Sequence, residues 1–134
     1  MKALFIGGTG TISMAITRSL ATNPDWELYL LNRGSRSAEL PSNVKVINVA
    51  DVNDEASVAK AIGGMTFDTV CDFICFHKEQ VERDIRLFKG KTRQFMAISS
   101  ASAYQKPLSS HIVNEATPLT NPYWQYSREK IEIE

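Results

Sequence analysis

The sequence has few residues that could hold a metal or form disulfides. It contains two cysteines and two histidines in 134 residues, and their positions lack the spacing of a zinc site. If the apolar run that contains Cys71 and Cys75 is a strand, both thiols point to one face and cannot easily bridge each other. We therefore predict no metal site, and we expect reduced core thiols, with His77 and His111 as packing residues.

A long hydrophobic run and an excess of one charge are also lacking. The apolar start of the chain reaches Gly7 after too few large residues for a signal peptide, so we predict a cytoplasmic protein with no membrane partner. Lysine plus arginine and aspartate plus glutamate number 15 each, so no overall field attracts nucleic acid, and basic and aromatic residues do not interleave as in single-strand binders. With 43% hydrophobic and 22% charged residues, the composition is that of one globular domain over 1–134.

What the sequence does contain is an alternation of apolar runs with helical stripes. Strands are expected at residues 2–6, 26–31, 44–49, 67–76 and 92–99. Apolar residues at helical spacing separate the first strand from the second, the third from the fourth and the fourth from the fifth, and a last helix is expected from about Pro122, after a loop over 101–120. This alternation predicts a Rossmann-type α/β domain, a doubly wound parallel sheet of about five strands buried on both faces.

A glycine-rich turn follows the first strand. Gly7, Gly10 and Ser13 stand at the G-x-x-G-x-x-G spacing, which places backbone amides and a helix amino terminus where a pyrophosphate can bind. Serine in place of the third glycine is expected to relax the packing of the helix on the sheet slightly. The alternative is an ordinary tight turn between a strand and a helix, but the β-α-β context favours a dinucleotide site.

The end of the second strand favours NADP(H), with NAD(H) possible. Asn32 stands where NAD-binding folds usually place an acid, so it lacks the charge that would repel a 2′-phosphate. Arg33 and Arg36 can pair with that phosphate, or they simply solvate a polar loop. Asp51 can accept from the adenine amino group, or it serves as a turn acid. The candidate cofactor-binding residues are Gly7, Thr9, Gly10, Thr11, Ile12, Asn32, Arg33, Arg36, Asp51 and Val52.

Tyr126 and Lys130 are spaced i, i+4 on the last expected helix, which stacks them on one face. For a tyrosine to move protons near neutral pH, its pKa must fall by about 3 from ~10, at ~4 kcal/mol. A unit charge ~4 Å away contributes about 4 kcal/mol at an effective dielectric of 20. The charge of Lys130 could therefore lower the pKa of Tyr126 by the amount that proton transfer requires. The alternative is a Tyr/Lys pair on a helix surface.

Three segments in this order resemble the extended short-chain dehydrogenase/reductase superfamily, atypical branches included, and within it the NAD-dependent epimerase/dehydratase family: GGTG at 7–10, ISSASAY at 98–104, and Tyr126-x-x-x-Lys130. The resemblance implies hydride transfer between a nicotinamide and a sugar carbon of a nucleotide-sugar. It also implies that Tyr126 is the acid/base, that Lys130 lowers its pKa and holds the ribose, and that Ser100, rather than Ser99, orients the substrate oxygen.

Atypical branches of this family provide the alternative function. Ser13 and the Asn32-Arg33-Gly34 segment are more typical of those branches, some of which keep the nucleotide site but act as RNA-binding or regulatory proteins. A non-catalytic NAD(P)-binding protein is therefore the competing hypothesis.

The resemblance covers essentially the whole chain, but family members continue past the Tyr-x-x-x-Lys helix into a sugar-binding lobe. The chain ends with Glu132 and Glu134 at a helix carboxyl end, where the helix dipole favours cations. We therefore expect residues 1–134 to be the amino-terminal part of a longer protein, truncated before the substrate-binding lobe. Such a chain is expected to bind cofactor without turnover, and its uncovered apolar surface favours a homo-oligomer.

Overall fold

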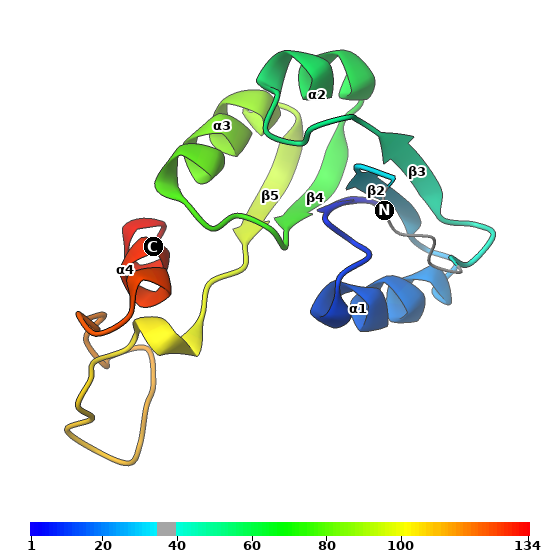
Figure 1. The fold of residues 1–134 in the computed structure, drawn as a ribbon. Helices are drawn as coiled ribbons and strands as arrows, with labels where there is room; N and C mark the ends of the chain where they lie inside the picture. Colours follow the sequence, from blue (N-terminus) through cyan, green and yellow to red (C-terminus); the bar gives the residue numbers. More distant parts are fainter. Residues whose placement is uncertain (35–39) are drawn as a thin grey trace.

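A computed structural model describes residues 1–34 and 40–134, and the predicted site residue Arg36 lies outside them (Figure 1). The described residues form a sheet of parallel strands in the spatial order β3-β2-β1-β4-β5. The strands are β1 (Lys2–Ile6), β2 (Glu27–Asn32), β3 (Lys45–Asn48), β4 (Phe67–Asp72) and β5 (Thr92–Ala97). The chain therefore runs outward from β1 to β3 and then crosses back to β4, which confirms the predicted Rossmann-type order of strands.

Helices cover both faces of this sheet. They are α1 (Thr11–Ala21), α2 (Glu55–Ile62), α3 (Lys78–Phe88), the short 3₁₀ helix η1 (Ala101–Ala103) and α4 (Gln125–Glu132). Figure 1 shows α1 on one side of the sheet and α2 with α3 on the other, while α4 lies in an arm that extends beyond the carboxyl end of β5. Within residues 1–34 and 40–134, no helix has both the length and the apolar character needed to cross a membrane.

The core is divided by the sheet into two apolar clusters. Leu4 and Ile6 of β1 pack with residues of α2 and α3 such as Val58 and Phe88, whereas the alternate residue Phe5 packs toward the α1 side, where Leu20 joins the cluster. Successive side chains of a strand point to opposite faces, so a strand buried on both faces must be apolar throughout. This is why continuous apolar runs predicted the strands.

Two strands, β4 and β5, end two or more residues earlier than predicted, and β3 ends one residue earlier, at Asn48. β4 ends at Asp72 rather than at residue 76, because Asp72 Oδ1 accepts a hydrogen bond from the Ile74 amide at 2.7 Å and turns the chain out of the sheet. Cys75 therefore follows the strand and does not share a face of it with Cys71. Both thiols are buried and free, as predicted, and burial raises the pKa of Cys71 to about 12 and that of Cys75 to about 11. β5 ends at Ala97 rather than at residue 99.

A buried cluster of charged side chains joins α3 to the end of β4. Asp72, Arg83 and Asp84 are 0%, 5% and 1% exposed. Arg83 Nη2 lies 2.7 Å from Asp84 Oδ1 and 3.8 Å from Asp72 Oδ2, so one guanidinium serves two carboxyl groups. Among the described residues, the Oδ2 atoms of both aspartates are buried without a hydrogen-bond partner. Burial, followed by the proximity of Asp72, raises the pKa of Asp84 to about 8, so Asp84 retains a proton in the fold.

The proton on Asp84 makes stability depend on pH. Because the folded state holds this proton at pH values where the unfolded state, with a pKa of about 3.9, has lost it, the free energy of unfolding should fall as the pH rises towards 8. Asp84→Asn mimics the protonated carboxyl and keeps an oxygen to accept from Arg83, so it should flatten the profile. Melting temperatures between pH 5.5 and 9 test this, with the exposed Asp25→Asn as control. Parallel profiles for wild type and Asp84→Asn would contradict it.

Candidate functional site

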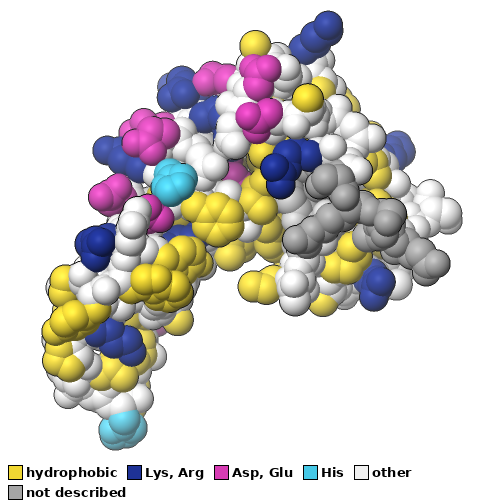
Figure 2. All heavy atoms as spheres, viewed as in Figure 1, with side chains coloured by type: hydrophobic (Ala, Val, Ile, Leu, Met, Phe, Trp, Pro, Cys, Tyr) yellow, Lys and Arg dark blue, Asp and Glu magenta, His cyan; other side chains and the backbone are white. Residues whose placement is uncertain are grey.

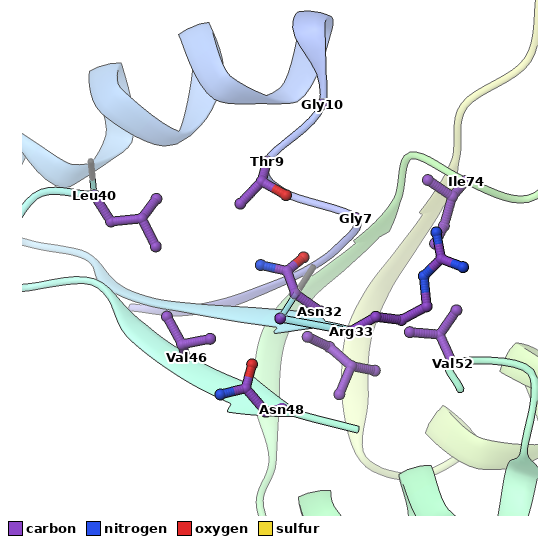
Figure 3. A pocket seen from close by; sticks show the side chains of 12 residues that line it. Gly7, Thr9, Gly10, Asn32, Arg33, Leu40, Val46, Asn48, Val52 and Ile74 are labelled. Atoms are coloured by element: carbon purple, nitrogen blue, oxygen red, sulfur yellow. The ribbon is translucent and has the colours of Figure 1, made fainter. Parts of the chain in front are cut away.

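A pocket of about 400 Å³ opens at the carboxyl ends of β1, β2 and β3, where the strand order crosses back to β4 (Figure 3). Ligands of open α/β sheets bind at this crossover. Six of the predicted cofactor residues line it: Gly7, Thr9, Gly10, Asn32, Arg33 and Val52. The candidate cofactor residues from the sequence did not include six further lining residues: Leu31, Gly34, Leu40, Val46, Asn48 and Ile74. Thr11, Ile12 and Asp51 do not line the pocket.

The glycines of the turn are required by backbone shape and close packing. Gly7 has a φ of +77°, and a Cβ on it would lie 2.5 Å from Cγ2 of Ile74. A Cβ on Gly8 would lie 2.4 Å from Cδ2 of Leu30. Real side chains do not tolerate such distances, so the turn can approach the β4 end and β2 this closely only without side chains. Gly10 is less crowded, since a Cβ on it would lie 3.3 Å from Oγ of Ser13.

Ser13 closes the turn through hydrogen bonds that the glycine spacing did not predict, and the expected relaxation of packing at this position stays a prediction. Its hydroxyl is buried, donates to the carbonyl of Gly7 at 2.8 Å and accepts from the amide of Gly10 at 2.8 Å. One helical turn later, the Thr17 hydroxyl donates to the carbonyl of Gly8 at 2.9 Å. Because the Gly10 amide is occupied, the amides that the start of α1 can offer to an anion are those of Thr11 and Ile12, which have no intrahelical acceptor.

Asn32 is a nearly buried carboxamide that points into the pocket (Figure 3). It is 8% exposed, and its side chain has no hydrogen-bond partner in the part of the chain that the structure describes. Its amide atoms are not among the buried, unpartnered side-chain atoms of the described residues, so the carboxamide is reachable from the pocket and can bond a polar ligand atom there. Asn32 therefore marks this pocket as a place that binds something polar.

Of the charged candidate residues that the structure describes, Arg33 lines the pocket and Asp51 does not. The Arg33 side chain extends toward the side of the pocket where Val52 and Ile74 lie (Figure 3). Asp51 Oδ1 accepts from the Asn53 amide at 2.9 Å and from Asn53 Nδ2 at 3.2 Å, so of its two predicted roles the structure places it in the turn. In the described part of the lining, the one charged side chain is the Arg33 guanidinium.

Lys130 anchors α4 to the sheet. Its ammonium donates to the carbonyl of Cys75 at 2.6 Å and to that of Ile98 at 2.7 Å, and the residue is 2% exposed. Nζ lies 5.6 Å from the centre of the Tyr126 ring and 5.1 Å from that of Phe76. Lys130 therefore holds the helix against the segments that follow β4 and β5, and it brings a positive charge beside Tyr126.

Ser100 caps the 3₁₀ helix next to α4. Its Oγ accepts from the Ser102 amide at 3.2 Å and lies 2.9 Å from Ser102 Oγ. Asn121 links this helix to α4, because its Nδ2 donates to the Ser102 carbonyl at 2.8 Å and to Ser127 Oγ at 3.3 Å. The structure thus brings Ser100, Tyr126 and Lys130 to the arm at the carboxyl edge, whereas none of the three lines the pocket.

The arm carries exposed apolar side chains (Figure 2). Ile112, Tyr123 and Trp124 are 62%, 75% and 57% exposed. The expectation of a homo-oligomer stays a prediction.

Within residues 1–34 and 40–134, no three His, Cys, Asp or Glu side chains are grouped so as to hold a metal ion.

No family profile and no curated protein matches the chain. Solved structures are similar to it. A UDP-glucose 4-epimerase matches with a TM-score of 0.81 and 18% identity, over 99% of this chain and 45% of that one. UDP-glucose 4-epimerase from Bifidobacterium longum, in complex with NAD+ and UDP, matches with a TM-score of 0.75 and 21% identity, over 98% and 46%. A wide-type short-chain dehydrogenase/reductase from Veillonella parvula DSM 2008, in complex with NADP, matches with a TM-score of 0.62 and 17% identity, over 76% and 48%.

These likenesses show the fold. The chain has the Rossmann-type α/β fold of these solved structures, as the alternation of strands and helices predicted, and it spans about half the length of the solved structures that it matches.

Gly7→Ala should destabilise the fold and distort the turn. The left-handed backbone and the contact with Ile74 together are expected to cost roughly 2–5 kcal/mol. Gly64→Ala is a matched control, since a Cβ there meets nothing within 4 Å, and it should leave the unfolding free energy nearly unchanged. Urea unfolding measures both. Equal stability of the two variants would show that the turn is not held as described.

Lys130→Met should loosen α4, because two main-chain carbonyls lose a charged donor. Hydrogen exchange of the amides over 125–132 should become faster, while that of β1 stays unchanged. Lys89→Met, which removes an exposed lysine, should change neither. Unaltered protection of α4 in Lys130→Met would refute the anchoring role.

Proposed function

We propose that this chain supplies the dinucleotide site of an NAD(P)-dependent, epimerase/dehydratase-like oxidoreductase that acts on a nucleotide-sugar by hydride transfer. The observation that carries the proposal is the pocket at the strand crossover, with the glycine turn on one side and the unpartnered Asn32 carboxamide on the other. Solved structures of the same fold hold NAD+ with UDP, and NADP, which supports a nicotinamide dinucleotide here.

The residues present fit such a cofactor. The amides of Thr11 and Ile12 at the start of α1 would hold its pyrophosphate, since anions bind at helix amino termini. Asn32 would bond a hydroxyl or phosphate of the adenosine ribose. Val52 and Ile74 provide apolar walls for the adenine. When bound, the nicotinamide supplies the hydride donor or acceptor, while the protein's part is to bind and orient it.

NADP(H) is favoured over NAD(H) by the charge of the lining. Among the described lining residues, Arg33 supplies one positive charge and no side chain is a carboxylate. A 2′-phosphate therefore meets attraction and no like-charge neighbour, whereas NAD-binding folds use an acid at this place to hold the ribose hydroxyls.

Ser100, Tyr126 and Lys130 are proposed as the catalytic groups. Tyr126 would donate or accept the proton at the substrate oxygen, helped by the positive charge of Lys130, whose Nζ lies 5.6 Å from the ring centre. An ammonium has three N–H donors, and two of those of Lys130 are used by main-chain carbonyls, which leaves one for a ribose hydroxyl. Ser100 would orient the substrate oxygen through its hydroxyl.

The rival function is a non-catalytic NAD(P)-binding protein, regulatory or RNA-associated. One observation favours it: the ammonium of Lys130 is buried and held by two carbonyls, an arrangement that a purely structural lysine would also show. Under this alternative, the pocket binds the dinucleotide while Tyr126 takes no part in any proton transfer.

Calorimetric titration of NADPH and NADH into the chain tests the proposed binding. Both should bind, NADPH more tightly, and Arg33→Ala should reduce the difference because the described lining loses its one positive charge. Absence of binding by either nucleotide would refute the proposed function, and equal affinities in wild type would refute the preference for NADP.

Tyr126→Phe separates catalysis from binding. In a form of the protein that includes a sugar-binding lobe, this change should slow hydride exchange with UDP-sugars by about 10²–10⁴-fold, the usual contribution of a positioned acid/base, without changing NADPH affinity. Tyr123→Phe, at a tyrosine 75% exposed on the same arm, should leave both unchanged. Hydride exchange that is absent in wild type, with NADPH binding intact, would favour the non-catalytic rival.

A further inference from the structure

Two carboxamides stand side by side at the ends of neighbouring strands. Asn32, the last residue of β2, is paired in register with Asn48, the last residue of β3, and both line the pocket. Side chains of residues paired across adjacent strands lie on the same face of the sheet. Asn48 is exposed, and neither carboxamide has a hydrogen-bond partner within residues 1–34 and 40–134. The pair therefore offers up to four N–H donors to a ligand.

Access to Asn48 depends on a missing side chain. Gly34 has a φ of +72°, and a Cβ on it would lie 3.3 Å from Oδ1 of Asn48. A larger residue at this position would crowd the carboxamide, so the glycine keeps the approach to Asn48 open. Arg33 lies between Asn32 and Gly34 in the sequence, and its side chain extends toward the Ile74 side of the pocket (Figure 3). The two carboxamides are thus reached directly from the pocket.

The chemistry of this pair suits a phosphomonoester. A phosphate group has acceptor oxygens only when fully ionised, so it can take hydrogen bonds from both Nδ2 groups. A carboxylate at either position would repel it, and the described lining contains none. The Asn32 carboxamide faces the pocket and has no partner among the described residues, so it can bond a ligand group there without breaking an existing contact.

We propose that Asn48, together with Asn32, is a specificity determinant that recognises a phosphate on the 2′ position of the adenosine ribose. The proposal rests on the dinucleotide site proposed above. It adds Asn48, which is not among the candidate residues from the sequence, as a residue that favours NADP over NAD because its side chain is uncharged. Asparagine at the end of β3 admits the phosphate, and aspartate at the same position would exclude it while still accepting a bond from a ribose hydroxyl.

The test compares nucleotides that differ in one phosphate. Adenosine 2′,5′-bisphosphate, adenosine 3′,5′-bisphosphate and AMP are titrated calorimetrically into wild type and Asn48→Asp. Wild type should prefer the 2′,5′ isomer over both others. Asn48→Asp should weaken the 2′,5′ isomer by roughly tenfold or more, because a unit charge is placed near the phosphate, and leave AMP unchanged. Circular dichroism and a thermal melt establish that the variant is folded.

Asn23→Asp is the matched control. It adds the same charge at an exposed turn between α1 and β2, where the side-chain oxygen accepts from the Asp25 amide and an aspartate can do the same. It should leave all three affinities unchanged. Equal weakening by both variants would mean that only net charge matters, and this would overturn the proposal.

The outcomes separate this proposal from the proposed function. If NADPH and NADH bind but Asn48→Asp weakens AMP as much as the 2′,5′ isomer, or wild type does not distinguish the two bisphosphates, Asn48 does not read the 2′ position and only this inference fails. If no dinucleotide binds to wild type, the proposed function fails and this inference with it.

Discussion

The close approach of the Gly7 turn to the end of β4 is the constraint on which the rest of the site depends. Left-handed backbone at Gly7 and the absence of a side chain there let the turn lie against Ile74. Ser13 and Thr17 then bind the turn to α1 from the helix side, through the carbonyls of Gly7 and Gly8. Held from both directions, the turn places Gly7 and Gly10 in the lining of the pocket and the start of α1 directly after them, where a helix amino terminus can bind an anion.

The segment after β4 connects this pocket to the arm that carries Tyr126. Asp72 turns the chain by accepting from the Ile74 amide, Ile74 lines the pocket, and the next residue, Cys75, gives its carbonyl to Lys130 of α4. Behind the segment, the Arg83 guanidinium pairs with Asp84 at 2.7 Å and lies 3.8 Å from Asp72 Oδ2, so it keeps a positive charge beside Asp72. A few consecutive residues therefore position a wall of the nucleotide pocket and the helix proposed to carry the acid/base.

The sequence was sufficient for the elements that depend on local patterns. Continuous apolar runs, helical stripes and the glycine turn predicted the order of strands and helices and six of the pocket residues, because each of these signals lies within a few neighbouring residues. The misses depend on side-chain hydrogen bonds and on strand register, which a pattern of apolar residues does not show. The apolar run after Asp72 resembles a strand, and it leaves the sheet where Asp72 Oδ1 accepts a hydrogen bond from the Ile74 amide. Asn48 gains its place from register with Asn32, which no local pattern encodes.

Ser13 illustrates why a departure from a motif has to be judged by its contacts. A glycine at this position would allow the closest packing of helix on sheet, so serine looks like a weakening of the motif. In the fold, its hydroxyl occupies the Gly10 amide and the Gly7 carbonyl, groups that would otherwise need other partners at the bend. The serine therefore closes the turn with two hydrogen bonds and leaves the next amides, those of Thr11 and Ile12, as the ones proposed to bind an anion. The turn keeps its shape because these two hydrogen bonds hold it where the usual motif has a glycine.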